Sequence, residues 1–414
     1  MPRKRNDIIS AVEIGSRYVK VLIAEILPGA SLNVIGFGES PSHKVDKGEI
    51  SNSKIVFEQL GLAVEKAEKM AGLAMDNICL VLTGNHIQTM NRQGNTPVNS
   101  NSVTEDDVVM VTRLGRTTSI PADSDLIHTL ERFFILDDSR KVQDPVGIVA
   151  SRLAVDVHII YGKRNNIMTS QKLVEDFFSQ TIYGTMFSGL CNAYAVMNEE
   201  DNEKGALSID IGAGTTEYIL YHGKTPQHSG VLTVGTNQIC NDLSLGLKID
   251  FNRCQQLLLK YGAALSQNDA RSRMIELPGL AGQKDRQIPR SSFEQIIEVR
   301  MRELFEIIHN DLERHKILNL IGNGIILSGG AAHMPQINQL VKEVFNVPCR
   351  TARIVDMNGD DDVLNKPSYA TCAGALKIGA IYFKMDRESK ASTLQELKTE
   401  VGKTWKNIKT AFRW

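Results

Sequence analysis

The sequence shows no excess of charge of either sign. Its 414 residues contain 47 Lys and Arg against 48 Asp and Glu, which gives a formal net charge of −1. A protein dedicated to nucleic acid normally carries a clear basic excess. We therefore expect no nucleic-acid partner, although a short basic segment remains compatible with this balance.

Cysteine and metal-binding motifs are also sparse. The six cysteines stand singly, with no CxxC pair, so we expect reduced thiols in a cytosol instead of a disulfide framework. The nine histidines show no HExxH or similar metal spacing. On this ground we expect no zinc site.

Long apolar runs are missing as well. No stretch of eighteen apolar residues occurs, so no segment is expected to span a bilayer. The apolar stretch that follows the basic N-terminus is interrupted by Glu13, which is not the pattern of a secretory signal. Any membrane contact is therefore expected to be peripheral.

A unit of strand, glycine turn and strand is present, and it occurs twice. Strands over 8–12 and 18–25 flank Gly15-Ser16, and strands over 207–211 and 216–221 flank Gly212-Ala213-Gly214. This weak internal duplication predicts an α/β protein with two similar lobes. The length of the chain agrees, because it exceeds what one compact core usually holds.

Other periodic segments complete the expected pattern. We predict helices over 55–74, 166–179, 250–264 and 292–315, strands over 32–37, 78–83, 153–160 and 324–327, and a polar inserted α/β unit over 85–163.

The two glycine turns are candidate phosphate sites. Glycine lets backbone N–H groups approach an anion with no Cβ in the way. A carboxylate precedes each turn, Glu13 or Asp210, and Lys20 lies one strand face further on. One or two carboxylates beside phosphates suit Mg²⁺, and we expect Asp210 nearest the metal. A lone glycine hairpin is usually only a hairpin. The pair, with SGG at 328–330 as a place for a nucleoside, favours a nucleotide.

The C-terminal residues predict a membrane-binding helix. An apolar stripe at spacings of four, three and four consists of Val401, Trp405, Ile408 and Phe412, and the basic residues off that stripe are Lys403, Lys406, Lys409 and Arg413. A basic face opposite an apolar face that holds both tryptophans of the chain is typical of an interfacial helix. The alternatives are a helix docked on the protein's own core or a calmodulin-type target. One such tail would bind weakly, whereas several on one assembly would bind far better.

Six segments carry a resemblance to a known family. They are VDKGEI at 45–50, TGNHI at 83–87, DPVG at 144–147, DIGAGT at 210–215, LSGGAA at 327–332 and the tail at 401–414. In this order they resemble FtsA, the bacterial cell-division proteins of the actin, Hsp70 and sugar-kinase superfamily. The resemblance implies an α/β, actin-like two-lobed fold of duplicated ribonuclease-H-like domains, with an FtsA-type inserted subdomain and a C-terminal amphipathic helix.

The resemblance also implies the division of the chain. The implied parts are a first lobe at 7–84 with 164–204 and 373–385, an inserted subdomain at 85–163, a second-lobe core at 205–250 with 320–372, a small second-lobe subdomain at 251–319, a flexible linker at 386–400 and a membrane-targeting helix at 401–414.

ATP and Mg²⁺ are the ligands that the resemblance implies. The matching positions are Gly15, Ser16, Gly212, Gly214 and Thr215 for the phosphates, Gly329 and Gly330 for the adenosine and Glu303 for the ribose. For Glu303, a solvated helix face is an equal alternative. Ala213 stands where a third glycine is usual, and Glu217 where an aspartate is common.

Hydrolysis of ATP is expected to be slow. The connecting segment FSGLCNA at 187–193 offers no carboxylate, and a general base must lie within hydrogen-bond reach of its proton.

The implied function is that of a cytoplasmic adaptor at the division site. It would polymerise, tether the FtsZ ring to the inner face of the cell membrane through its tail, and meet other division proteins, with 251–319 contacting FtsZ. Two alternatives share the fold: a pilus-assembly adaptor and a small-molecule kinase. A kinase would need a catalytic carboxylate near the phosphates, and the tail together with 45–50 favours the division protein over the pilus adaptor.

Overall fold

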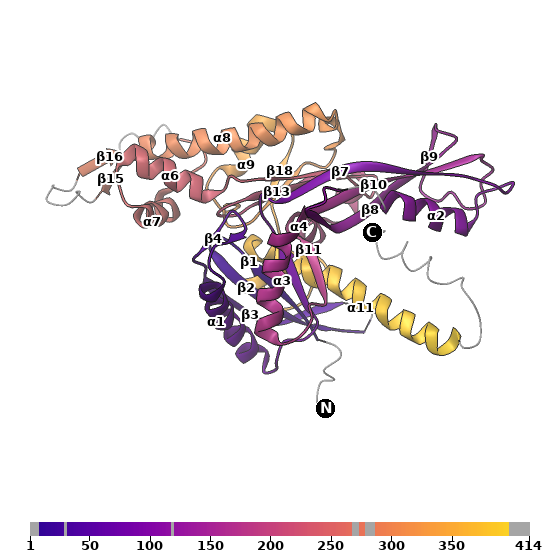
Figure 1. Ribbon diagram of the computed structural model, residues 1–414. Coiled ribbons are helices and arrows are strands. Elements are labelled where there is room, and N and C mark those ends of the chain that lie inside the picture. The colour runs from indigo at the N-terminus through magenta and orange to yellow at the C-terminus, as the bar shows by residue number, and fades with distance from the viewer. Residues whose placement is uncertain (1–7, 29–30, 117–119, 267–272, 278–285, 397–414) are drawn as a thin grey trace.

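The frame of the molecule consists of two five-stranded sheets, seen in a computed structural model that describes residues 8–28, 31–116, 120–266, 273–277 and 286–396 (Figure 1). In the first sheet the order is β11-β6-β1-β2-β3. β1 runs antiparallel to β2 and parallel to β6. The strands are β1 (Ile8–Ile14), β2 (Tyr18–Ile26), β3 (Leu32–Pro41), β6 (Ile78–Leu82) and β11 (Gly184–Phe187).

The second sheet repeats the first strand for strand. Its order is β14-β13-β12-β17-β18, again with an antiparallel hairpin beside a parallel pair. The predicted duplication is therefore confirmed, and each sheet is the centre of one lobe. The strands are β12 (Ala206–Ile211), β13 (Thr216–His222), β14 (Thr225–Leu232), β17 (Ile325–Ser328) and β18 (Cys349–Thr351).

Helices cover the first sheet and complete its core. In α1 the apolar residues recur at helical spacing and pack against β2 and β3. The helix begins after Asn52, whose side chain accepts a hydrogen bond from the N–H of Ile55, and it ends at Gly72, whose φ of 69° favours glycine. The helices of this lobe are α1 (Ser53–Ala71), α3 (Arg164–Phe178), α4 (Ser188–Val196) and α11 (Ala370–Glu396), and two short strands, β4 (Val45–Asp46) and β5 (Glu49–Ile50), lie beside them.

A third sheet forms the inserted unit, which lies beside the second sheet in Figure 1. Its strand order is β7-β10-β8-β9, and α2 packs against β7 and β10 over a separate apolar core. The elements are β7 (Ile87–Pro97), α2 (Glu105–Arg116), β8 (Ser124–Leu136), β9 (Arg140–Val142) and β10 (Arg152–Lys163).

Side chains of the inserted unit bind the edge strand β14 of the second lobe. The hydroxyl of Thr89 donates to the backbone oxygen of Ser229 at 2.6 Å. Arg132 donates to the side chain of Gln227 at 2.7 Å and forms a largely buried ion pair with Asp156 at 2.7 Å. Directional bonds from two of its strands therefore fix the insert on the second sheet.

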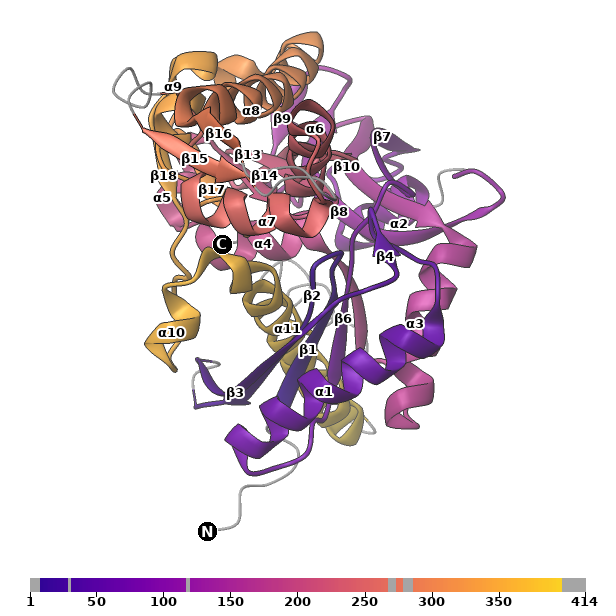
Figure 2. The same ribbon diagram turned by 90° about the vertical axis from the view of Figure 1, so that its left-hand side faces the viewer.

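A group of helices and a small hairpin extends the second lobe away from the insert (Figures 1 and 2). Apolar side chains from α6, α7, α8 and α9 share one core with the second sheet. The elements are α6 (Thr236–Leu247), α7 (Phe251–Tyr261), β15 (Met274–Leu277), β16 (Arg286–Pro289), α8 (Arg290–Arg314) and α9 (Ile337–Phe345). Shorter helical turns are α5 (Glu199–Lys204), η3 (Leu318–Leu320), α10 (Asp361–Leu364) and η4 (Pro367–Tyr369).

The predicted flexible linker at 386–400 is wrong over its first part. Helix α11 continues to Glu396 without a break. The charged residues that suggested a linker are also good helix formers, and neither Gly nor Pro occurs between 380 and 396. The predicted membrane helix at 401–414 lies outside the described residues. Among the described residues, no helix is long and apolar enough to cross a bilayer.

Candidate functional site

The two glycine hairpins predicted from sequence lie against each other. The N–H of Gly15 donates to the oxygen of Tyr18 at 3.1 Å and closes the first turn, and the N–H of Gly212 donates to the oxygen of Thr215 at 2.9 Å and closes the second. A Cβ on Gly214 would lie 2.4 Å from the hydroxyl oxygen of Ser16. Only glycine at that position lets the two hairpins approach so closely.

The turn between β4 and β5 joins the hairpins. The backbone nitrogen of Lys47 lies 3.0 Å from where a Cβ on Gly214 would be. Gly48 has a φ of +80°, and a Cβ there would lie 2.4 Å from the oxygen of Thr83. The VDKGEI segment therefore packs its turn beside the second hairpin and the end of β6, which explains why it requires glycine at its centre.

The tips of the hairpins present free backbone donors. Within the described part of the chain, the N–H groups of residues 16–17 and 213–214 have no hydrogen-bond acceptor. Successive N–H groups at a turn form a concave anion site when no side chain covers them. The two tips can therefore receive an anion such as a phosphate group.

Four charged residues flank the turns of the two hairpins at matching positions. Glu13 is paired with Lys20 across the first hairpin, and Asp210 is paired with Glu217 across the second. Because the two sheets share one topology, Glu13 corresponds to Asp210 and Lys20 to Glu217. The duplication thus places three acids and one base around the contact of the lobes.

Lys20 neutralises Glu13 within this group. Its Nζ lies 3.2 Å from Oε1 of Glu13 and donates to the backbone oxygen of Ser368 at 2.6 Å. Burial alone would lower the pKa of Lys20, but the negative charges of Glu13 and Asp210 help to raise it above its ordinary value. Lys20, predicted as a nucleotide contact, is therefore held by an ion pair beside the first hairpin.

Asp210 is buried, with 8% of its surface exposed. The hydroxyl of Thr371, in the first turn of α11, donates to its Oδ2 at 2.8 Å. Burial and the nearby charge of Glu13 raise the pKa of Asp210 to about 6. Asp210 and the partly buried Glu13 interact electrostatically, which favours a cation beside them, and carboxylate oxygens are ligands that suit Mg²⁺.

Glu217 is the most buried acid of the group, with 3% of its surface exposed. The hydroxyl of Thr83, at the end of β6, donates to its carboxyl group and lies 3.1 Å from the hydroxyl of Thr215. Burial and the charge of Asp210 raise the pKa of Glu217 to about 8. Thr83 belongs to the first lobe, so this hydrogen-bond network connects the two lobes.

Sequence reasoning missed the residues at the start of α11 that hold the acids. Thr371 binds Asp210, and the next residue, Cys372, donates its thiol hydrogen to Oε2 of Glu13 at 3.4 Å. Nothing in the local sequence marks these two side chains. One signal in the sequence could have added Glu217 to the site. The spacing from Asp210 to Glu217 is the same as the spacing from Glu13 to Lys20, and both pairs lie opposite each other across a hairpin.

The predicted adenosine glycines follow β17 next to Asp210. Gly329 has a φ of +82°, and a Cβ there would lie 2.4 Å from Oδ1 of Asp210. A Cβ on Gly330 would meet no atom within 4 Å. Gly329 is therefore required by close packing, whereas Gly330 borders open space.

Glu303, the predicted ribose contact, lies in a different cluster. Its half-exposed carboxylate pairs with Arg300 on α8 at 2.6 Å, and Arg300 also binds Asp242 on α6 at 2.6 Å. Within the described residues, no hydrogen bond or ion pair joins Glu303 to either hairpin.

Two sheets of one topology, whose glycine hairpins face each other, define the actin-like class of two-lobed proteins. A solved structure of the PilM–PilN type IV pilus biogenesis complex covers 90% of this chain and 98% of its own, with a TM-score of 0.63 at 13% identity. MreB5 of Spiroplasma citri bound to ADP covers 92% of this chain and 98% of its own, with a TM-score of 0.52 at 13% identity. At these identities the likeness shows the fold alone.

Sequence comparison adds the family. A family model for the cell division protein FtsA matches residues 207–374, and a model for the SHS2 domain inserted in FtsA matches residues 84–161. The FtsA of Neisseria meningitidis is 29% identical over 89% of this chain and 89% of its own length, and that of Pseudomonas aeruginosa is 27% identical over 90% and 89%. The chain belongs to the FtsA family of cell-division proteins.

Proposed function

We propose that this protein binds ATP with Mg²⁺ between its two lobes, forms actin-like polymers and holds the FtsZ ring at the cytoplasmic side of the cell membrane. The observation that carries the nucleotide part is the pair of facing hairpins with free tip N–H groups beside buried acids. Family membership supports a role in division and self-association.

The residues of the site suit the phosphates of a nucleotide. The tips at 16–17 and 213–214 supply backbone donors, and Gly214 leaves the space that a side chain would fill. The Ser16 hydroxyl now lies against Gly214, so a phosphate chain between the hairpins replaces this contact. MreB5 of Spiroplasma citri, which has this fold, has been solved with ADP and with AMPPNP.

The acids suit a bound Mg²⁺. Asp210 and Glu13 would hold it, directly or through water, and its charge would neutralise part of the phosphate charge. Thr371 and Cys372 orient these two carboxylates from the start of α11.

Slow hydrolysis follows from the same arrangement. Burial and the charge of Asp210 raise the pKa of Glu217, which favours its protonated form at neutral pH, and a protonated carboxyl group is a poor base toward water. The connecting helix α4 contributes Ser188 and Asn192 as polar side chains and no carboxylate. We therefore expect a turnover below about 1 s⁻¹, at the low end of ordinary enzyme rates.

The membrane and FtsZ parts of the proposal rest on sequence and family. The stripe of Val401, Trp405, Ile408 and Phe412 would enter the interface, and Lys406, Lys409 and Arg413 would face anionic headgroups. The region 251–319 is the proposed contact for FtsZ. Because one tail binds weakly, a polymer would hold the membrane where a single subunit would not.

A glycine substitution tests the nucleotide site. In Gly214→Ala the new Cβ meets Ser16 at 2.4 Å and covers the tip donors, so we expect ATP affinity to fall at least tenfold, as about 1.4 kcal/mol is a factor of ten. Isothermal titration with Mg·ATP measures it. Gly61→Ala on α1, where a Cβ meets only the ring of Phe177 at 3.4 Å, is the matched control. Equal affinity of both variants and the parent would refute the site.

Tryptophan emission tests the membrane part, because both tryptophans lie in the tail. Anionic vesicles should shift the emission of the full chain to the blue and sediment it. A chain ending at residue 396 keeps the whole of α11 and should remain in the supernatant. Absence of both effects with ATP present would remove the membrane anchor from the proposal and leave the nucleotide site untouched.

A further inference from the structure

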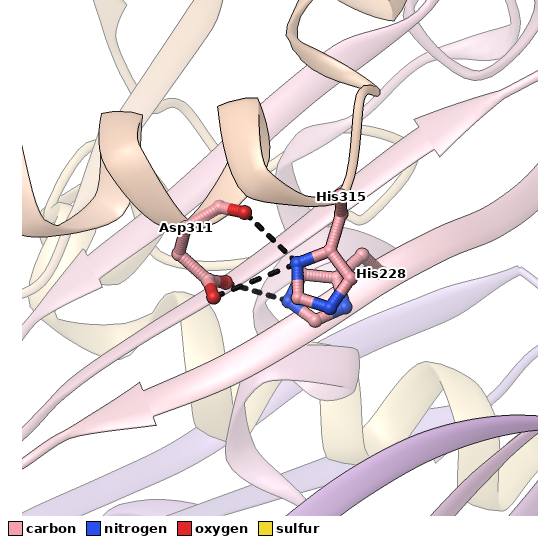
Figure 3. Close-up of side chains that lie close together, drawn as sticks. All are labelled: His228, Asp311 and His315. Carbon is pink, nitrogen blue, oxygen red and sulfur yellow. Dashed lines mark hydrogen bonds and ion pairs between the residues drawn. The ribbon is translucent and has the colours of Figure 1, made fainter.

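Two histidines and an aspartate converge where β14 meets the end of α8, away from the hairpin site (Figure 3). Nε2 of His228 lies 2.7 Å from Oδ2 of Asp311, and Nδ1 of His315 lies 3.6 Å from Oδ1 of the same carboxylate. The three ligand atoms that the residues offer all lie within 4.8 Å of one another. Figure 3 shows a nitrogen of each ring turned toward the carboxylate.

The local structure explains this convergence. Asp311 and His315 are four residues apart at the end of α8 and share one face of the helix. The rings of His315 and His228 stack with centroids 4.1 Å apart. Tyr218 crosses β14 at Gly230, where a Cβ would lie 2.4 Å from the phenol oxygen, and its hydroxyl donates to Oδ2 of Asp311 at 2.5 Å.

We propose that His228, Asp311 and His315 bind a divalent transition-metal ion of the Zn²⁺ type. Two imidazole nitrogens and one carboxylate oxygen form a ligand set that zinc accepts, with water in the remaining position. Around a tetrahedral zinc ion with bonds of about 2.0–2.1 Å, ligand atoms lie roughly 3.3 Å apart. One ligand atom from each of the three residues lies within 4.8 Å of the other two, so rotations of the rings and of the carboxylate can bring all three atoms to the ion.

Charge and access agree with this proposal. The aspartate supplies the negative charge, and the facing nitrogen of His228 can present a lone pair while its other nitrogen keeps the proton. Nδ1 of His315 donates to the backbone oxygen of Asp311 at 2.8 Å, so metal binding there requires that the proton move to Nε2 and that this hydrogen bond break. Of the three side chains, 14% of His228, 21% of Asp311 and 46% of His315 is exposed. The ion can therefore arrive from solvent at His315 without opening the core.

A metal at this point would join parts of the chain that sequence separates. His228 lies on β14, next to Ser229, whose hydroxyl bonds Nε2 of His158 on β10 at 2.8 Å and whose backbone oxygen accepts from Thr89 on β7. The site therefore includes a residue of β14, the same strand on which the inserted unit docks. Occupancy would stiffen that strand against α8 and stabilise the docked insert. Metal binding at this site requires neither a bound nucleotide nor a membrane.

Zinc titration of the full chain, first stripped with EDTA, tests the proposal. We expect one Zn²⁺ per chain in a chelator-buffered titration, a thermal midpoint that rises with zinc, and no comparable binding of Mg²⁺. His315→Ala should reduce zinc affinity by at least about tenfold. Loss of a residue that only orients a metal ligand already lowers affinity by about tenfold to a hundredfold, and loss of a ligand should cost no less. The half-exposed position of His315 at a helix end makes this variant compatible with folding.

His309→Ala is the matched control, because His309 lies on the same helix with its ring against Phe345 at 5.5 Å. It should bind zinc like the parent. Cobalt provides a second measurement: Co²⁺ should give the visible bands of a nitrogen and oxygen site, which His315→Ala loses. Equal zinc affinity in His315→Ala and the parent, no uptake by the parent, or a thiolate-to-cobalt band that assigns the ion to a cysteine would each overturn the proposal.

Discussion

Replacing Glu217 by glutamine should stabilise the protein relative to the parent, and the difference in the free energy of unfolding should grow as the pH rises. The glutamate is buried on β13 with its carboxyl group against the hydroxyl of Thr83, and burial together with the charge of Asp210 raises its pKa from 4.5 to about 8. The folded state therefore favours the protonated acid. Its contribution to stability is fully present below the unfolded pKa of 4.5 and is lost as the pH rises through 8.

The size of the effect follows from the distance between the two pKa values. Each pH unit between them changes the free energy of unfolding by about 1.4 kcal/mol, so full ionisation of Glu217 destabilises the fold by at most about 5 kcal/mol. Glutamine has the shape of the protonated acid and cannot ionise. The variant should match the parent within about 1 kcal/mol near pH 4.5, and its advantage should grow up to pH 8 and then level off.

Urea unfolding of nucleotide-free protein at pH 5, 7 and 8.5 measures this difference. Glu306→Gln is the matched control, because Glu306 is exposed on α8 and the same change of charge there should leave the difference constant with pH. A stability difference between Glu217→Gln and the parent that stays flat across this range would refute the reasoning, since it would mean that Glu217 is ionised throughout.

Three further predictions concern packing and polar contacts. Gly374→Ala places a Cβ 1.6 Å from the oxygen of Cys191, so α11 must move from α4, with a loss of at least about 1–3 kcal/mol in urea unfolding; unchanged stability would contradict this packing. Thr371→Val removes the hydroxyl that binds Asp210 and should weaken Mg·ATP binding more than it weakens binding of ATP in EDTA; equal losses would exclude a role at the metal. Arg132→Met leaves the buried partner acid without its cation, which should cost about 3–5 kcal/mol and expose the insert to proteolysis; resistance equal to the parent would show that other contacts suffice.

The fold could be predicted from sequence where local pattern decides it. Two strand–glycine–strand units indicated the duplication, and both sheets formed around them. The linker at 386–400 was misread because Arg, Glu and Lys serve equally well in a solvated loop and in a helix, and only the rest of α11 decides between them. The tail is the part of the prediction that lies beyond the described residues.

The sequence indicated part of what the structure brings together. The hairpin glycines and Asp210 were predicted because turn chemistry and a preceding acid are visible in the chain, and they lie at the contact of the two lobes. The role of Thr371 was not predicted, since it reaches Asp210 across 161 residues of sequence. The cluster of Asp311 and His228 was missed for the same reason. The two residues are 83 positions apart, and only the tertiary packing of β14 and α8 brings them together.

Helix α11 joins the two acids to a long continuous helix that ends at Glu396. Its first turn grips Glu13 and Asp210 through Cys372 and Thr371, and its 27 residues form a rod of about 40 Å. A continuous α-helix of this length moves largely as one rigid element. A shift of the two carboxylates would therefore move the helix up to Glu396 with them.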